Sequence, residues 1–153
     1  MRWCAQMMIE KAEYPGELNE RVMLPNRRSV RIRALHRGED GPIYELDAHL
    51  SLRTRYDRFF LPRPALPESV IRQLACVDYR RQLALIAEYD GNSGREVVAL
   101  ASLAAIDERR AEVGLVVCDE WQQQGVGTAL ANKQPRGPLY GLSSPTRRDP
   151  PAL

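Results

Sequence analysis

The hydrophobic and polar positions of this chain follow two different periods along its length. Around 29–35, apolar Val30, Ile32 and Ala34 alternate with polar residues, which is the period of two expected for a strand with one solvated side. Between 39 and 77, apolar residues recur every three or four positions, as in helices with one buried face. From 82 to 118 the pattern changes to apolar runs of strand length with polar turns between them. The predicted elements are a strand at 29–35, helices at 39–50, 51–60 and 68–77, strands at 82–89, 96–105 and 111–118, and a helix that begins near Thr128.

This order of elements, β-α-α-α-β-β-β-α, predicts an α/β domain with a mixed, mainly antiparallel sheet. The glycine-containing turn at 90–94 and the short polar connection at 106–110 each indicate a hairpin. Residues 1–27 are interpreted as an N-terminal extension and residues 28–133 as the folded domain. Residues 134–153 contain five prolines among glycines and serines, which leave no window for a regular element, so a disordered C-terminal tail is predicted.

The amino-acid composition indicates the class of protein, but it does not identify a function. The chain has 153 residues, 44% of them hydrophobic, and a net charge of +2, which is ordinary for one soluble domain. No apolar run is long enough to cross a membrane, and the first residues lack the apolar core of a secretory signal, so a cytoplasmic location is predicted. The cysteines and histidines do not have the spacing of a metal site, so no metal is predicted; they are Cys4, Cys76, Cys118, His36 and His49.

Arginines concentrate between positions 27 and 37, which raises the question of nucleic-acid binding. Arg31 and Arg33 alternate with apolar residues, and no aromatic residues lie between them. The stretch is therefore interpreted as the solvated side of a strand, and no nucleic-acid partner is predicted.

The stretch 109–130, RRAEVGLVVCDEWQQQGVGTAL, joins an apolar strand to a glycine-rich loop and the start of a helix. Gly125 and Gly127 allow close approach of a backbone to a ligand, and the first N–H groups of a helix attract an anion. The loop lacks the lysine of a P-loop until Lys133 and lacks the third glycine of the dinucleotide fingerprint. A different phosphate-binding loop is therefore indicated.

This loop, Q-x-x-G-x-G behind an E-V-x-x-V-V strand, resembles the acyl-CoA loop of the GNAT superfamily of N-acetyltransferases. The segment 50–60, LSLRTRYDRFF, resembles the LSxxSxYxRFF segment of bacterial protein-lysine acetyltransferases, and residues 31–33 and 77–79 resemble the same branch. The resemblance runs from about 30 to about 130. It implies that residues 28–133 form the amino half of a GNAT-like fold, and that the carboxyl half is missing or frame-shifted. The fourth strand would then expose an edge, which predicts self-association.

The resemblance also implies a reaction, in which acetyl-CoA as cosubstrate acetylates an amine, a protein lysine, by direct attack. A lysine ammonium has a pKa near ~10.4, so a base must take its proton. Glu112 lies where the branch carries its proposed base. Glu112, Gly114 and Val116 share one strand face, which is expected to look into the cleft while the opposite row packs on helices. The residues implied for acetyl-CoA binding are Leu115, Val116, Val117, Gln122, Gln123, Gln124, Gly125, Val126, Gly127 and Thr128.

Several alternatives stay open at this point. Glu112 could instead form a surface ion pair with Arg109 or a neighbouring residue. Cys118 could be a nucleophile or a packing residue, and Trp121 could stack on a ligand or pack against the helix. For the whole chain, the alternatives are a truncated CoA-binding module without catalytic activity and an arginine-rich protein that binds acidic partners. The loop at 122–127 argues against the second of these.

Overall fold

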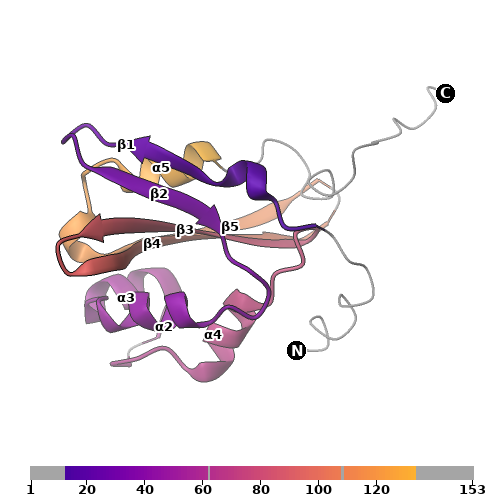
Figure 1. Ribbon diagram of the computed structural model, residues 1–153. Coiled ribbons are helices and arrows are strands. Elements are labelled where there is room, and N and C mark those ends of the chain that lie inside the picture. Colours follow the sequence, from indigo (N-terminus) through magenta and orange to yellow (C-terminus); the bar gives the residue numbers. More distant parts are fainter. Residues whose placement is uncertain (1–12, 62, 108, 134–153) are drawn as a thin grey trace.

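The computed structural model describes residues 13–61, 63–107 and 109–133, which form a five-stranded sheet with helices on both faces (Figure 1). The strands are β1 (Glu20–Met23), β2 (Ser29–Ala34), β3 (Gln82–Gly91), β4 (Gly94–Ala105) and β5 (Ala111–Val117). The helices are α2 (Gly41–Ala48), α3 (Leu52–Phe59), α4 (Glu68–Ala75) and α5 (Val126–Lys133), with short 3-10 helices η1 (Gly16–Leu18) and η2 (Asp119–Trp121). The predicted α/β class is confirmed, and from residue 29 onward the helices and long strands follow the predicted order.

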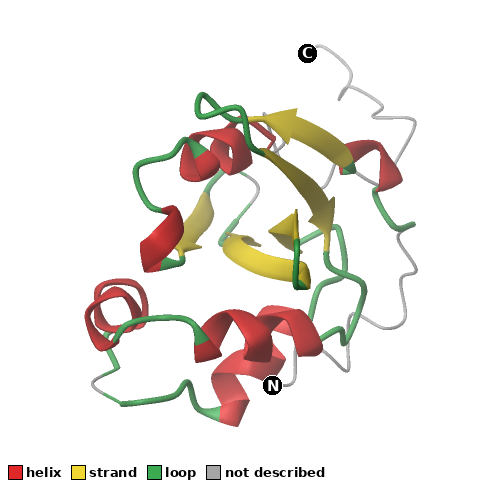
Figure 2. Ribbon diagram, turned by 60° about the vertical axis from the view of Figure 1, so that its left-hand side comes forward, coloured by secondary structure: helices red, strands yellow, loops and turns green. Residues whose placement is uncertain are grey.

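The sheet has the spatial order β1-β2-β3-β4-β5, and every pairing between these strands is antiparallel. Helices α2, α3 and α4 lie on one face and α5 on the other (Figures 1 and 2). Because both faces are covered, β3 is buried without interruption from residue 83 to residue 88. Ile43 and Ile71 reach the core from one side and Leu130 from the other, each at most 1% exposed.

Local sequence explains where α3 begins and ends. The Ser51 side chain accepts a hydrogen bond from the Thr54 N–H at 3.1 Å, which satisfies one of the unpaired donors of the first turn. Phe60 ends the helix in the left-handed conformation, with a φ of 55°. The segment that carries the family resemblance is therefore a short helix with a defined start and end.

One strand lies where no regular structure was predicted. β1 falls within the residues interpreted as an N-terminal extension, yet it pairs with β2 from Glu20↔Ile32 to Met23↔Ser29. Only Val22 of its four residues is even partly buried, so the hydrophobic pattern of an edge strand is too weak to detect. The tail predicted at 134–153 lies outside the described residues. Within the ranges that the structure describes, no helix has the length and apolar character needed to cross a membrane.

Candidate functional site

The outer edge of β5 presents main-chain groups that no described strand covers. The other edge of β5 pairs with β4. Just after β5, the Cys118 N–H donates to the Val98 carbonyl at 2.9 Å, and just before β5, the Arg110 carbonyl accepts from the Ile106 N–H, also at 2.9 Å. Since successive residues of a strand alternate between its two edges, even-numbered residues bond to β4, whereas Leu115 and Val117 direct their N–H and C=O groups outward. The structure thus places these two predicted residues at an accessible strand edge.

A cavity of about 530 Å³ lies beside this edge, between β5 and α3. Its volume falls within the roughly 300–1,000 Å³ of small-molecule sites. Leu115, Val116, Val117 and Gln122 line it, so the structure brings four of the predicted cosubstrate residues together. The opposite wall is made by side chains of α3, among them Thr54 and Arg58; we refer to this cavity as the slot.

The loop between η2 and α5 adopts a strained conformation before the helix begins. Gln123 and Gly125 both have left-handed backbone conformations, with φ values of 61° and 92°. Val126 is the first residue of α5 and is buried, whereas Thr128 is exposed, and the Ala129 N–H donates to the Gly125 carbonyl at 3.0 Å. The first N–H groups of α5 are therefore at the loop, as an anion-binding helix start requires.

Two glutamine side chains hold this loop against the rest of the fold. Gln122 Nε2 donates to the Val117 carbonyl at 3.1 Å and to Thr54 Oγ1 at 3.2 Å, so it joins the end of β5 to α3. Gln124 Oε1 accepts a hydrogen bond from Asn26 Nδ2 at 2.9 Å. The loop is thus tied on one side to the slot and on the other side to the β1–β2 turn.

The two glycines of the loop also have packing roles. A methyl group at position 125 would lie 3.0 Å from Pro25 Cδ, which is closer than packed carbons approach, and the positive φ adds strain for any side chain. A methyl group at position 127 would lie 3.2 Å from Leu115 Cδ2, so Gly127 lets α5 approach β5 closely. The glycine pattern therefore serves the fold as well as any ligand.

Glu112 lies at the start of β5 and lines a smaller cavity of about 190 Å³ next to the slot. This cavity, here called the inner cavity, is enclosed by α3, α4 and strands β3 to β5, with Phe59 and Gln73 among its lining residues. The alternative ion pair of Glu112 is not found: among the described residues no ion pair includes Glu112, and the Arg110 guanidinium pairs with Asp107 at 2.7 Å.

The sequence predicted that one face of β5 would look into the cleft and that the other would pack on helices, and the structure differs on the second point. The row with Glu112 and Gly114 does face a cavity, but that cavity lies under α3 and α4, so helices cover this face too. On the opposite face, Val113 is 54% exposed and Leu115 40% exposed. The predicted packing of that row on helices is therefore wrong for Val113, whereas Leu115 and Val117 lie next to Gly127 of α5.

Arg58 is the functional candidate that the sequence did not single out. Its side chain lines both cavities, and its Nη2 donates to Ser102 Oγ at 2.9 Å. Its guanidinium carbon lies 4.7 Å from the centre of the Phe59 ring. Burial lowers the pKa of the Arg58 guanidinium, and the negative charge of Glu112 acts in the opposite direction. Arginine remains a cation at neutral pH even so. The only sequence signal was its place in the YDRFF segment.

Asp119 fixes the position of α3 relative to the loop. Its carboxylate accepts hydrogen bonds from the Ser51 N–H at 3.2 Å, Ser51 Oγ at 2.8 Å and Thr54 Oγ1 at 3.0 Å. Burial favours the neutral acid, but the hydrogen bonds from Ser51 and Thr54 outweigh it and lower the pKa of the Asp119 carboxyl below its ordinary value. Its partners Thr54 and Ser51 lie 65 and 68 positions away along the chain, so these contacts were not visible in the sequence.

The sequence left the roles of Cys118 and Trp121 open, and in the structure both are packing residues. Cys118 is 3% exposed, and burial raises the pKa of its thiol to about 12, so it does not supply a thiolate at neutral pH. Trp121 is 4% exposed, with its ring centre 4.7 Å from that of Tyr89 and the Arg28 guanidinium 5.2 Å away on the ring face. In the part of the chain that the structure describes, no three acidic, histidine or cysteine side chains gather as a metal site would need.

The profile of the Acetyltransferase (GNAT) family matches residues 47–133, which is more than half of the chain. The chain belongs to the GNAT acetyltransferase family. The matched range contains α3, β5, the slot and the loop before α5. The family resemblance stated from the loop and from the segment 50–60 is therefore confirmed, and GNAT domains use acetyl-CoA as cosubstrate.

A solved GNAT domain shows the same fold. The GNAT domain of S. lividans PAT is 23% identical, with a TM-score of 0.70 over 86% of this chain and 74% of that one. A cAMP-binding acyltransferase from Mycobacterium smegmatis is 18% identical, with a TM-score of 0.46, and the match covers 85% of this chain and 35% of that one. Among curated proteins, no significant match was found. The GNAT-like fold predicted from the sequence is confirmed.

Proposed function

We propose that this chain transfers the acetyl group of acetyl-CoA to an amine and that the amine is a lysine side chain of a protein. The observation that carries the proposal is the slot, where the open edge of β5 meets Gln122, the first residue of the loop that leads into α5. A ligand with peptide-like amides followed by a pyrophosphate matches this order of groups. The segment 50–60, which forms α3, supports a protein acceptor through its resemblance to protein-lysine acetyltransferases.

The main chain does most of the cosubstrate binding in this proposal. Leu115 and Val117 offer outward N–H and C=O groups to the pantetheine amides, as a neighbouring strand would. The N–H groups around Val126 and Gly127 receive the pyrophosphate at the positive end of α5. Gln122 lies between the strand that binds the amides and the loop that binds the pyrophosphate, and its side chain bonds to both β5 and α3.

Glu112 is the proposed general base. The amine attacks the thioester carbon only as the free base, and the carboxylate of Glu112 accepts the proton that it loses. Glu112 is exposed at the inner cavity, which shares Arg58 with the slot, so an acceptor entering there approaches the acyl end of the cosubstrate. Direct transfer follows from the buried state of Cys118, the free thiol among the described residues.

A Glu112→Gln variant tests this proposal. We expect kcat to fall by roughly 10²–10⁴-fold while the affinity for acetyl-CoA, measured by calorimetry, stays within about twofold. The loss should shrink as the pH rises from 7 to 9, because more lysine is then neutral. Glu45→Gln, an exposed glutamate of α2, is the matched control and should change neither quantity. Loss of cosubstrate binding in Glu112→Gln would contradict the assigned role.

A second function, CoA binding without turnover, is favoured by one observation. β5 pairs with β4 alone among the described strands, so the slot has a strand on one side only. Calorimetry with acetyl-CoA followed by a thiol-release assay on mixed protein substrates separates the two. Binding without release of CoA would select this second function, and release that depends on Glu112 would select the transferase.

A further inference from the structure

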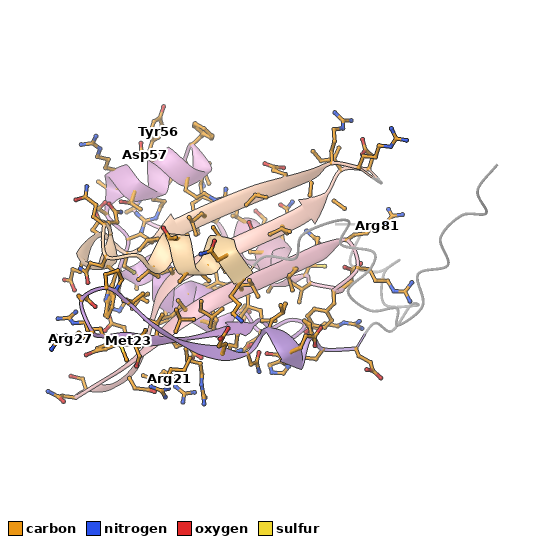
Figure 3. All side chains as sticks on the ribbon, turned by 90° about the horizontal axis from the view of Figure 1, so that it is seen from above. Arg21, Met23, Arg27, Tyr56, Asp57 and Arg81 are labelled. Atoms are coloured by element: carbon orange, nitrogen blue, oxygen red, sulfur yellow. The ribbon has the colours of Figure 1, made fainter. Side chains whose placement is uncertain are left out.

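Arg58 lies where the two cavities of the site meet. The neighbouring α3 residues are more exposed: Tyr56 lies at the outer side of the molecule (Figure 3), and Asp57 is exposed at the slot. Arg58 instead reaches inward to Ser102 of β4 and is half-buried beside Gly114. A half-buried cation is costly to desolvate, and the Ser102 hydroxyl and the negative charge of Glu112 offset part of that cost.

The hydrogen bonds of Arg58 leave most of its donors available. A guanidinium carries five N–H donors. Ser102 Oγ accepts one of them among the described residues, and Phe59 packs against the flat face of the group, which uses none. The remaining donors border the slot and the inner cavity. They are available to a group that becomes negative during the reaction.

Acetyl transfer creates such a charge. The amine nitrogen forms a bond to the carbonyl carbon, the carbon–sulfur bond breaks, and its electron pair leaves on sulfur, while the proton of the amine passes to Glu112. A thiol has an ordinary pKa near ~8.5, so the departing sulfur can persist as a thiolate near neutral pH if a cation lies beside it. No proton donor is then required at the moment the bond breaks.

We propose that Arg58 is a catalytic residue that stabilises the thiolate of the departing CoA. This inference rests on the proposed function, because it requires that the acyl end of acetyl-CoA reaches the Arg58 side of the slot. A purely structural Arg58 would hold α3 to β4 through Ser102 and would not distinguish a thiolate from a thiol. The two roles therefore predict different binding of the product.

The test is the affinity for CoA as a function of pH, compared with desulfo-CoA, which lacks the sulfur. For the unmodified protein we expect CoA binding to tighten by tenfold or more between pH 6.5 and 9, as the thiol ionises, while desulfo-CoA binding stays flat. In Arg58→Gln, CoA should lose this pH dependence and behave like desulfo-CoA. Arg58→Lys keeps the charge and should retain part of it. In turnover with acetyl-CoA, Arg58→Gln should lose about 10²–10³-fold in kcat.

The matched control is Arg72→Gln on α4, where an exposed arginine pairs with Glu68. It should leave both pH profiles unchanged. A flat CoA profile in the unmodified protein, or an unchanged profile in Arg58→Gln, would overturn the proposal. Failure of CoA and desulfo-CoA alike to bind the unmodified protein would instead refute the proposed function. If Arg58→Gln does not fold, the profile of the unmodified protein and that of Arg58→Lys decide the matter.

Discussion

Gly114→Ala is the most informative single substitution in this site, because it moves Arg58 without removing its charge. A methyl group at position 114 would overlap the Arg58 guanidinium. Gly114 is not one of the glycines with a positive φ, so alanine fits the backbone there. The arginine side chain is long and half-buried, so it can swing out to solvent and lose its bond to Ser102.

The expected size of each effect shows whether Gly114→Ala acts through stability or through catalysis. Losing a hydrogen bond from a charged donor costs about 1.5–3 kcal/mol, and alanine in place of a compatible glycine returns about 0.4–1 kcal/mol. The net destabilisation is about 0.5–2.6 kcal/mol, or a melting temperature lower by roughly 2–10 °C. A domain with the usual stability of at least about 5 kcal/mol stays about 98% folded or more after that loss. A structural Arg58 would therefore leave activity almost intact, whereas a catalytic Arg58 predicts a loss of about 10²–10³-fold.

The assay combines thermal melting with steady-state release of CoA at saturating acetyl-CoA. Gly41→Ala is the control, because a methyl group there would contact nothing within 4 Å. It should change neither melting nor rate by more than the error of measurement. A Gly114→Ala protein that melts a few degrees lower but turns over at the normal rate would refute the assignment of Arg58 to catalysis.

Three further predictions concern other parts of the site. Asp119→Asn should lower the free energy of unfolding by about 0.5–1 kcal/mol at pH 6, since both ends of the contact are exposed. Because the folded pKa of Asp119 lies below its ordinary 3.8, this stabilisation is present above that pH and is lost on acidification, so urea unfolding should show the two proteins converging toward pH 3. Cys118→Ala should keep kcat, and mass spectrometry of the unmodified protein during turnover should show no acetyl adduct on that thiol, given its pKa of about 12. Gly125→Val should lower the free energy of unfolding by roughly 1–3 kcal/mol and abolish acetyl-CoA binding. The control Gly38→Val, at a φ of 71° but in open space, should cause similar backbone strain and leave binding intact. Equal binding by both variants would contradict the loop assignment.

The parts of the fold that the sequence predicted are those with a local pattern. β2 was expected at 29–35 and is observed as Ser29–Ala34, because apolar residues alternate there over a half-buried strand. The loop at 122–127 was found because its glycines and glutamines follow one another directly. β1 was not predicted because an exposed edge strand needs no hydrophobic alternation. Its extended conformation is stabilised by pairing with β2 and not by a pattern in its own residues.

The part of the site that the sequence missed depends on contacts between distant residues. Arg58 and Ser102 are 44 positions apart, and neither has a distinctive neighbour pattern. Gly114 was interpreted as part of a strand face, whereas the structure gives it a specific reason, which is the guanidinium that lies across it. Chemistry that arises where a helix packs on a sheet cannot be detected from spacing along one segment.

The bond between Asn26 and Gln124 joins residues 98 positions apart, and it has a consequence for the order of folding. The turn that holds the glycine loop lies at the far end of the sheet from β5 in strand order, so the loop has its partner only after all five strands have paired. Contacts of such long sequence separation form slowly and late. During refolding, the capacity to bind acetyl-CoA should therefore develop after the far-ultraviolet circular dichroism signal has recovered, and a ligand added early should not speed the assembly of the sheet.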